Sequence, residues 1–242
     1  VCMVLVSGYF VYLYYLLQTH EVYTQNPQWE YHFFIEKPVW ELPEEEFIKS
    51  SLDLTTLDYE SDTSYQKYVD PEVPFQDLWY IPPDMRKPSL RYITDTRGDL
   101  QLRESAALAL EELAEEFYND FWEKVVVVSS YRSYERQRQI KAGWCPDHLC
   151  AKAWYSEHQS GLAVDFWSAS TEAYWKSSER LMRFYDWLYE NAHLYGYHNS
   201  YQNGVEIDGY AIEPWHWRYL WVELATYLKE KDITFAELFY TF

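Results

Sequence analysis

Regularly spaced hydrophobic residues begin near the middle of the chain and predict two long helices. Across residues 101–122 the apolar positions recur every three or four residues, which is typical of an amphipathic helix. These positions are Leu102, Ala106, Leu110, Leu113, Phe117 and Phe121. Residues 178–195 predict a second amphipathic helix, which we expect to end at Gly196.

Shorter segments around these helices predict strands and two further helices. Residues 125–128 are four consecutive valines, which β-branching favours as a buried strand. Residues 162–167 and 210–217 are also expected to form strands, whereas 133–142 and 219–229 are expected to form helices. Helices and strands are interleaved, and the strands are too few for a doubly wound sheet, so we expect an α+β fold.

The first third of the chain lacks this regularity. Residues 1–17 carry no charge and are almost wholly apolar, at the short end of the length that spans a membrane. We expect a membrane anchor here, with the rest of the chain outside the cytoplasm; a buried helix or strand and a cleaved signal peptide are the alternatives. Residues 18–88 are rich in Pro, acidic residues and Tyr. We expect them to form partly a linker and partly short elements laid over the main domain, residues 89–242.

Acidic residues outnumber basic ones, which excludes one class of partner. The 242 residues include 39 Asp and Glu against 20 Lys and Arg, and the formal net charge is −19. Proteins that bind nucleic acid neutralise phosphates with clustered Lys and Arg. No such cluster is visible in this sequence, so we expect no nucleic-acid partner and a well-solvated surface.

Two of the three cysteines lie close together. Cys145 and Cys150 flank a four-residue segment that contains His148. A short loop with two cysteines fits a disulfide in an oxidising compartment. A structural zinc site that includes His148 is the alternative, but such a site usually has a second paired motif, and none is present. The disulfide is therefore favoured.

The strongest chemical signal is the segment 156–165, SEHQSGLAVD, which pairs His158 with Asp165. Gly161 permits a sharp change of backbone direction between them, and Asp165 falls on the predicted strand 162–167. An imidazole and a carboxylate that meet at one point supply two of the three protein ligands of a catalytic zinc ion.

A second motif, Glu213-Pro-Trp-His216, can complete such a site. A catalytic zinc ion keeps three protein ligands and one open position for water, so His216 can be the third ligand. Glu213 could then take the proton of that water as a general base. We interpret the other histidines as ordinary surface or core residues; they are His20, His32, His148, His193 and His198.

The patterns SxHxxGxAxD and ExxH together resemble the D-alanyl-D-alanine carboxypeptidase family of the VanY type, which has the Hedgehog/DD-peptidase fold. The resemblance extends over about residues 100–227. It implies a small antiparallel sheet flanked by helices, zinc ligands His158, Asp165 and His216, and Glu213 as the base. It further implies removal of the terminal D-Ala from peptidoglycan stem peptides, and we expect the protein to be a monomer. An L,D-carboxypeptidase, an endopeptidase and a non-catalytic zinc-bound binding module are the alternatives.

The same resemblance assigns substrate contacts. In the family, the Arg and Gln of the segment that here reads Ser130-Tyr131-Arg132 to Gln137 line the substrate site. Arg132 would bind the peptide carboxylate or stabilise the oxyanion as a catalytic residue. Gln137 and Ser156 could supply further hydrogen bonds. An exposed Arg at a helix start is the alternative interpretation of this short motif.

The sequence departs from the family at two turns. Relatives carry Pro-Gly-Tyr where this chain has Ala153-Trp154-Tyr155, and Tyr-Leu-Gly where it has Tyr219-Leu220-Trp221. The chain has only 7 Gly but 12 Trp. These observations suggest that the source reads the codon UGA as glycine while the printed sequence reads it as tryptophan. A protein that is truly rich in aromatic residues is the alternative.

Overall fold

The computed structural model describes residues 52–168 and 170–241. These residues belong to one compact unit. The predicted membrane anchor at 1–17 and the first part of the predicted linker lie outside the described residues. Among the residues that are described, no helix combines the length and hydrophobicity needed to cross a membrane.

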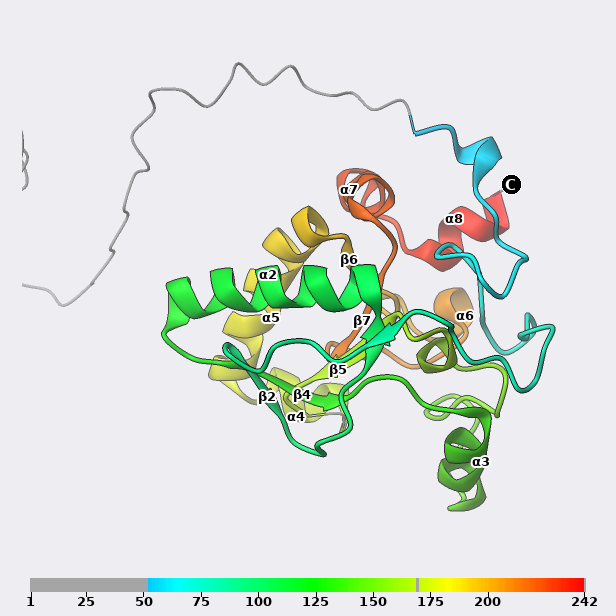
Figure 1. Cartoon of the computed structure of the whole chain (residues 1–242), viewed down its shortest axis with the longest axis horizontal. Helices are drawn as coiled ribbons and strands as arrows, with labels where there is room; N and C mark the ends of the chain where they lie inside the picture. Colours follow the sequence, from blue (N-terminus) through cyan, green and yellow to red (C-terminus); the bar gives the residue numbers. More distant parts are fainter. Residues whose placement is uncertain (1–51, 169, 242) are drawn as a thin grey trace, which may run out of the picture. The chain divides into compact units, whose positions relative to one another are not determined.

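A five-stranded sheet organises the unit (Figure 1). Its strands follow the order β2 (Ile93–Asp95), β4 (Val125–Ser129), β5 (Ala163–Phe166), β7 (His216–Tyr219) and β6 (Tyr197–Asn199). Three of the neighbouring pairs are antiparallel, as expected, but β2 and β4 are parallel. The helix between β2 and β4 carries the chain back along the sheet, which is the connection that parallel strands require. A two-stranded sheet of β1 (Met85–Arg86) and β3 (Leu102–Arg103) accompanies the main sheet.

All four predicted helices are confirmed. They are α2 (Glu104–Phe121), α3 (Tyr134–Ala142), α5 (Glu179–Asn191) and α7 (Val222–Lys231). A 3₁₀ turn, η3 (Ala192–Tyr195), extends α5 to Gly196, whose φ of 76° ends the helical segment as expected. The shorter helices are η1 (Leu54–Thr56), η2 (Glu157–Ser160), α4 (Glu172–Lys176), α6 (Val205–Asp208) and α8 (Phe235–Thr241).

The strand predicted over 210–217 is wrong for most of its length. Only His216 and Trp217 belong to a strand, β7, which continues to Tyr219. Pro214 cannot donate a backbone hydrogen bond to a neighbouring strand, so the preceding residues form a loop. Tyr210 and Trp215 are nevertheless buried in this loop, which explains why the segment resembled a buried strand. The short strand β6 carried too little pattern to be predicted.

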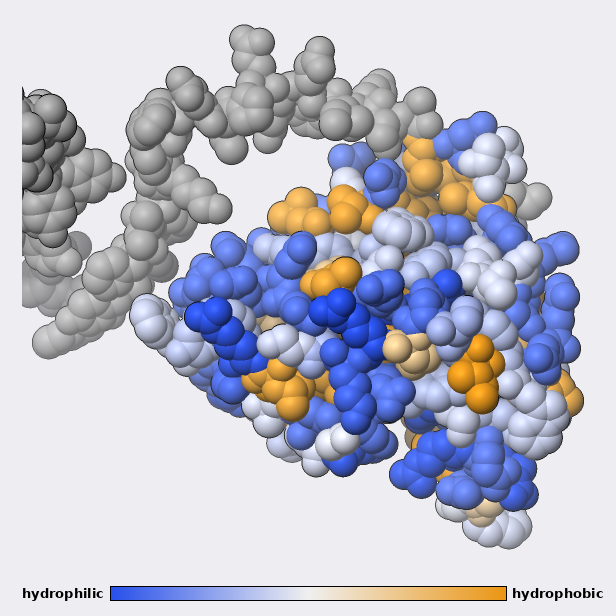
Figure 2. Space-filling view, in the orientation of Figure 1, coloured by the Kyte–Doolittle hydropathy of each residue, from blue (hydrophilic) through white to orange (hydrophobic). Residues whose placement is uncertain are grey.

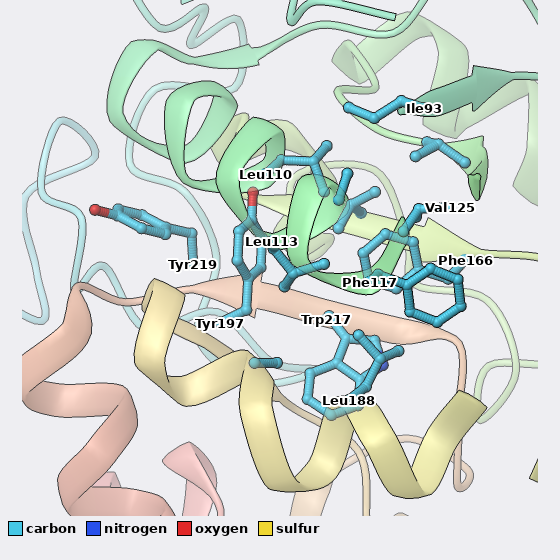
Figure 3. Close-up of a cluster of buried hydrophobic side chains, with 14 of the residues drawn as sticks. Ile93, Leu110, Leu113, Phe117, Val125, Phe166, Leu188, Tyr197, Trp217 and Tyr219 are labelled. Atoms are coloured by element: carbon cyan, nitrogen blue, oxygen red, sulfur yellow. The ribbon is translucent and has the colours of Figure 1, made fainter. Parts of the chain in front are cut away.

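The two faces of the sheet have different characters. Val164 and Trp217 are paired on β5 and β7 and belong to the main hydrophobic core, whereas the neighbouring pair, Asp165 and His216, faces the opposite side. Figure 3 shows this core, in which side chains of α2 and α5 surround those of the strands. The labelled members include Leu110, Leu113, Phe117, Phe166, Leu188 and Trp217. Hydrophobic packing on one face therefore leaves the other face for polar chemistry.

Residues 52–88 are laid over the domain and bury several aromatic side chains. Tyr68 packs in a second core with Leu220, Leu224 and Phe235 from the C-terminal helices and the turn before them. In Figure 1 this segment runs past α8 and beside the sheet. Phe75 is also buried, and its backbone N–H donates to Trp154 O at 2.9 Å. This part of the chain contains little regular secondary structure, as its sequence predicted.

The predicted disulfide is confirmed. Cys145 and Cys150 are bridged, and their Cα atoms lie 5.8 Å apart. The bridge closes the loop that follows α3, which stands out from the rest of the domain in Figure 1. Within the described residues, His148 is not part of a cluster that could hold a metal.

The surface agrees with the acidic composition. The face shown in Figure 2 is largely hydrophilic, and its hydrophobic areas are small and separate from one another.

Candidate metal centre

Three elements bring His158, Asp165 and His216 to one buried point. His158 lies in η2, Asp165 on β5, and His216 at the start of β7. Direct pairing of Asp165 with His216 in the β5–β7 ladder places their side chains next to each other. Gly161, with φ of 70°, turns the chain from η2 toward β5, so that His158 faces the same point.

The distances are those of a cluster that can bind a cation. One ligand atom from each of the three residues lies within 4.8 Å of the other two. His216 Nδ1 is 3.0 Å from Asp165 Oδ1, and His158 Nε2 is 3.3 Å from Asp165 Oδ2. All three side chains are buried. Within the described residues, no other group of three His, Cys, Asp or Glu meets this condition.

Each imidazole is held through its other nitrogen. His158 Nδ1 lies 2.7 Å from Ser130 O, so it donates there and Nε2 carries the lone pair toward Asp165. His216 Nε2 lies 2.8 Å from Glu157 Oε2, so its Nδ1 is directed toward Asp165. Partners of this kind fix the tautomer and the ring orientation of histidines that bind metals.

Glu157 is a central residue of the site that the sequence analysis missed. Besides His216, its carboxylate accepts a hydrogen bond from Ser200 Oγ at 2.7 Å and one from Arg218 at 2.8 Å. Arg218 is fully buried and also donates to the backbone oxygen of Lys67. A buried charge usually has a partner of opposite charge. Arg218, in a strand whose other residues are aromatic, could therefore have indicated that a buried carboxylate lies beside it.

The electrostatics of the cluster favour a positive charge at its centre. Burial alone would lower the pKa of His216, but hydrogen bonds to Asp165 and Glu157 outweigh burial and raise it to about 10. Burial would likewise raise the pKa of Asp165, but His158 and His216 hold it well below its usual range. Burial and the nearby charge of Arg132 lower the pKa of His158 to about 4. The cluster thus contains a neutral imidazole (His158), a carboxylate (Asp165) and an imidazole (His216) whose anionic neighbours favour a positive charge. A divalent metal ion would supply such a charge.

Glu213 lies beside this cluster but outside its three donors. Its Oε2 is 3.9 Å from His216 Nδ1, and 14% of its side chain is exposed. Burial is the main cause that raises its pKa, to about 7. The backbone around it is fixed, because Asn199 Nδ2 donates to the backbone oxygens of both Glu213 and His216, at 2.9 and 2.6 Å. A carboxyl group with this pKa can either accept or give a proton near neutral pH.

The predicted substrate residues occupy different surroundings. Arg132 follows β4, and its Nε is buried without a hydrogen-bond partner in the described part of the chain. Burial lowers its pKa, while the charges of Asp165 and Glu213 oppose that shift. Ser156 is buried directly before η2. Gln137 instead donates to Ala151 O at 2.6 Å and thereby ties α3 to the disulfide loop.

A mixed sheet that presents two imidazoles and a carboxylate at one buried point describes an α+β domain with a group of side chains that could hold a metal ion. Comparison with known protein families identifies one matching family. The sequence profile of the VanY family, D-alanyl-D-alanine carboxypeptidase, matches residues 99–222, about half of the chain. The chain therefore belongs to the VanY family of D-alanyl-D-alanine carboxypeptidases.

Individual relatives agree with this assignment. The protein YodJ of Bacillus subtilis (strain 168) is 30% identical over 174 residues, a match that covers 66% of this chain and 62% of YodJ. The solved structure of the LdcB LD-carboxypeptidase is similar with a TM-score of 0.62 and 27% identity, and the match covers 74% of this chain and 86% of LdcB.

A vancomycin resistance D,D-pentapeptidase VanY in complex with Zn(II) has the same fold. The TM-score is 0.53 at 24% identity, and the match covers 71% of this chain and 96% of that structure. The expected fold class is thus confirmed.

Proposed function

We propose that this protein is a zinc-dependent carboxypeptidase that removes the terminal D-Ala from peptidoglycan stem peptides. The observation that carries the proposal is the buried cluster of His158, Asp165 and His216 with Glu213 beside it. Three protein ligands with a nearby carboxyl group are the pattern of a catalytic zinc site, whereas structural zinc sites usually have four protein ligands.

The donor atoms suit zinc better than the other common divalent ions. Two imidazole nitrogens and one carboxylate oxygen are typical zinc ligands, whereas magnesium and calcium prefer oxygen ligands alone. The similar VanY structure contains Zn(II), which supports the same choice here. When bound, zinc supplies a Lewis acid and lowers the pKa of water toward ~7.

Glu213 would act as the general base and then as the general acid. Its pKa of about 7, raised chiefly by burial, lets it take a proton from water and give that proton to the leaving amine of D-Ala. Its place outside the three donors keeps its carboxylate available for this transfer.

Arg132 would bind the substrate. Its buried Nε has no acceptor in the described residues, and its guanidinium is subject to the charges of Asp165 and Glu213, so we expect it to donate to a carboxylate or to the oxyanion of the tetrahedral intermediate. The backbone N–H of Arg132 donates to His158 O at 3.1 Å, which ties this residue to the metal cluster. Ser156, two residues before His158, would supply a further hydrogen bond.

The disulfide supports a location outside the cytoplasm, where such bonds persist and where the proposed substrate occurs. An anchor formed by residues 1–17 would hold the domain at the membrane and stays a prediction.

Activity on defined peptides tests the proposal. The full chain, loaded with zinc, is incubated with muropeptides that end in D-Ala-D-Ala or in L-Lys-D-Ala, with and without a chelator, and released D-Ala is measured. We expect release from the first substrate, loss of release with chelator, and recovery with zinc. Release from the second substrate alone would identify an L,D-carboxypeptidase, which the similarity to LdcB makes the second candidate.

Glu213→Gln separates an enzyme from a binding module. Because the amide cannot accept the proton, release should fall by about 10²–10⁴-fold while zinc content is kept. His216→Ala should lose zinc and activity together, because it removes a ligand. Glu206→Gln, a change of an exposed carboxylate on α6, is the matched control and should leave both unchanged. A wild-type protein that holds zinc but cleaves none of the peptides would be a binding module.

A further inference from the structure

Tryptophan occupies backbone positions that normally require glycine. Six described residues other than glycine have a positive φ, and five of them are Trp. Their φ values lie between 52° and 68°, and they are Trp122, Trp144, Trp154, Trp167 and Trp221. Five glycines of the described chain share this left-handed region. Among the described residues, the sixth non-glycine residue with a positive φ is Asp232.

The left-handed conformation is unfavourable for tryptophan. In this region the Cβ atom of an L-residue approaches the following carbonyl oxygen, and bulky side chains are rare there. Asn and Asp tolerate it because their short polar side chains bond to the local backbone, which an indole cannot do. Five such residues of one type therefore call for a common cause.

The local roles of these residues are those of glycine. Trp122 follows the last turn of α2 in the left-handed conformation, and its N–H donates to Tyr118 O at 2.8 Å. This is the position after a helix where glycine is strongly enriched. Trp221 precedes the first residue of α7 with φ of 68°. Each of these turns depends on a backbone angle that glycine adopts without strain.

The rings of Trp154, Trp167 and Trp221 contact other aromatic rings, but within the described residues none of the five indole N–H groups donates a hydrogen bond. Among the Trp residues with negative φ, the indole N–H groups of Trp175, Trp187 and Trp217 donate to Ser168 O, Asp120 Oδ2 and Pro214 O. By contrast, Trp122 is 79% exposed and Trp144 is 95% exposed.

The ring of Trp167 packs against Phe117 and Phe184 of the main core, but its polar group is not accommodated there. Its indole N–H is buried and has no partner in the described part of the chain. A buried indole N–H usually finds an acceptor.

We propose that the protein made by its source carries glycine at positions 122, 144, 154, 167 and 221. The printed tryptophans would then be UGA codons that the source reads as glycine. Comparison with the turns of the family suggested this hypothesis at positions 154 and 221. The backbone angles extend it to all five positions. The proposal is independent of the proposed function, because none of the five residues is a metal donor.

Glycine at 154 would change the surface next to the site. The ring of Trp154 stacks on Tyr134, with centroids 5.4 Å apart and planes 6° from parallel. Position 154 lies two residues before Ser156, and Tyr134 lies two residues after Arg132. With glycine at 154, this face of the Tyr134 ring is free to contact a substrate peptide.

The codons and the protein itself give the direct test. We expect UGA at the five positions and UGG at the buried Trp175, Trp215 and Trp217. Peptides from protein isolated from its source should have the mass of glycine at 122, 144, 154, 167 and 221. UGG codons at these positions, or peptides that contain Trp there, would overturn the proposal.

Stability of the full recombinant chain gives an independent test. Trp122→Gly should raise the melting temperature by about 2–4 °C, because glycine adopts the left-handed angle without the Cβ penalty. Trp122→Ala removes the indole but keeps the Cβ atom, so it should give no such gain. Trp79→Gly is the matched control, since Trp79 is 65% exposed and has a negative φ. Equal effects of Trp122→Gly and Trp79→Gly would contradict the argument from backbone angles.

Discussion

Replacing Glu157 by Gln tests whether the carboxylate behind His216 determines metal binding. Gln keeps the size of the side chain but removes the charge that faces His216 Nε2 at 2.8 Å and Arg218 at 2.8 Å. The imidazole then loses its anionic partner, and the buried guanidinium loses its counter-charge. Both effects follow from one change, but they are measured differently.

The expected magnitudes follow from burial. Arg218 and Glu157 are both almost completely inaccessible, so breaking the pair leaves a buried charge that water cannot reach. Removing one partner of such a pair costs about 3–5 kcal/mol of stability. Loss of the residue that orients a metal-binding histidine weakens metal affinity by about 10–100-fold. Backbone oxygens of Lys67 and Tyr65 still accept from Arg218, so the stability loss should lie toward the lower end.

A double variant separates the two effects. Glu157→Gln combined with Arg218→Met removes both charges, so part of the lost stability should return, although the backbone oxygens of Lys67 and Tyr65 then lose their donor. Zinc affinity should stay reduced, because His216 still lacks the carboxylate. Affinity is measured by competition with a chromogenic chelator, and stability by denaturant unfolding in the presence of EDTA. If Glu157→Gln bound zinc as tightly as the wild type, the carboxylate would have no role in orienting His216.

Three further predictions concern other parts of the molecule. Cys145→Ser with Cys150→Ser should lower stability by about 2 kcal/mol, seen as faster proteolysis of the loop after α3. Burial would raise the pKa of Asp84, but hydrogen bonds from Arg103 and Tyr65 outweigh burial and lower it. The stabilisation that the Asp84 carboxylate provides is therefore lost as the pH falls through this lowered pKa. In denaturant titrations, the stability of Asp84→Asn should depend less on acid pH than that of the wild type. Zinc at ~100 times its dissociation constant should stabilise the wild type by about 2.7 kcal/mol relative to EDTA, measured by denaturant unfolding.

The elements and residues that the sequence predicted correctly have local signals. The apolar face of α2 and the valines of β4 carry their own periodicity, so they could be placed without knowledge of the fold. The cluster of His158, Asp165 and His216 was predicted because two short motifs contain it completely. Its geometry depends on the β5–β7 register, which the alternation of buried apolar and polar residues on these strands determines.

The support of the cluster could not be predicted in this way. Glu157 lies in η2, Ser200 directly follows β6, and Arg218 lies on β7. Ser200 and Arg218 are 43 and 61 positions away from Glu157 in the sequence. Strand β6 is only three residues long and has no pattern of its own. Such a network exists only after the sheet has formed, because its members share no local spacing.

The irregular segment 52–88 has a physical reason for its lack of periodicity. Its backbone oxygens accept hydrogen bonds from arginines of the domain: Arg218 donates to Lys67 O and Tyr65 O, and Arg103 donates to Thr63 O. A segment whose carbonyl groups are satisfied by side chains need not form a helix or a strand. Arg218 bonds Glu157 with its other terminal nitrogen, so this segment is joined to the carboxylate that orients His216. The covering segment therefore completes the support of the candidate metal site.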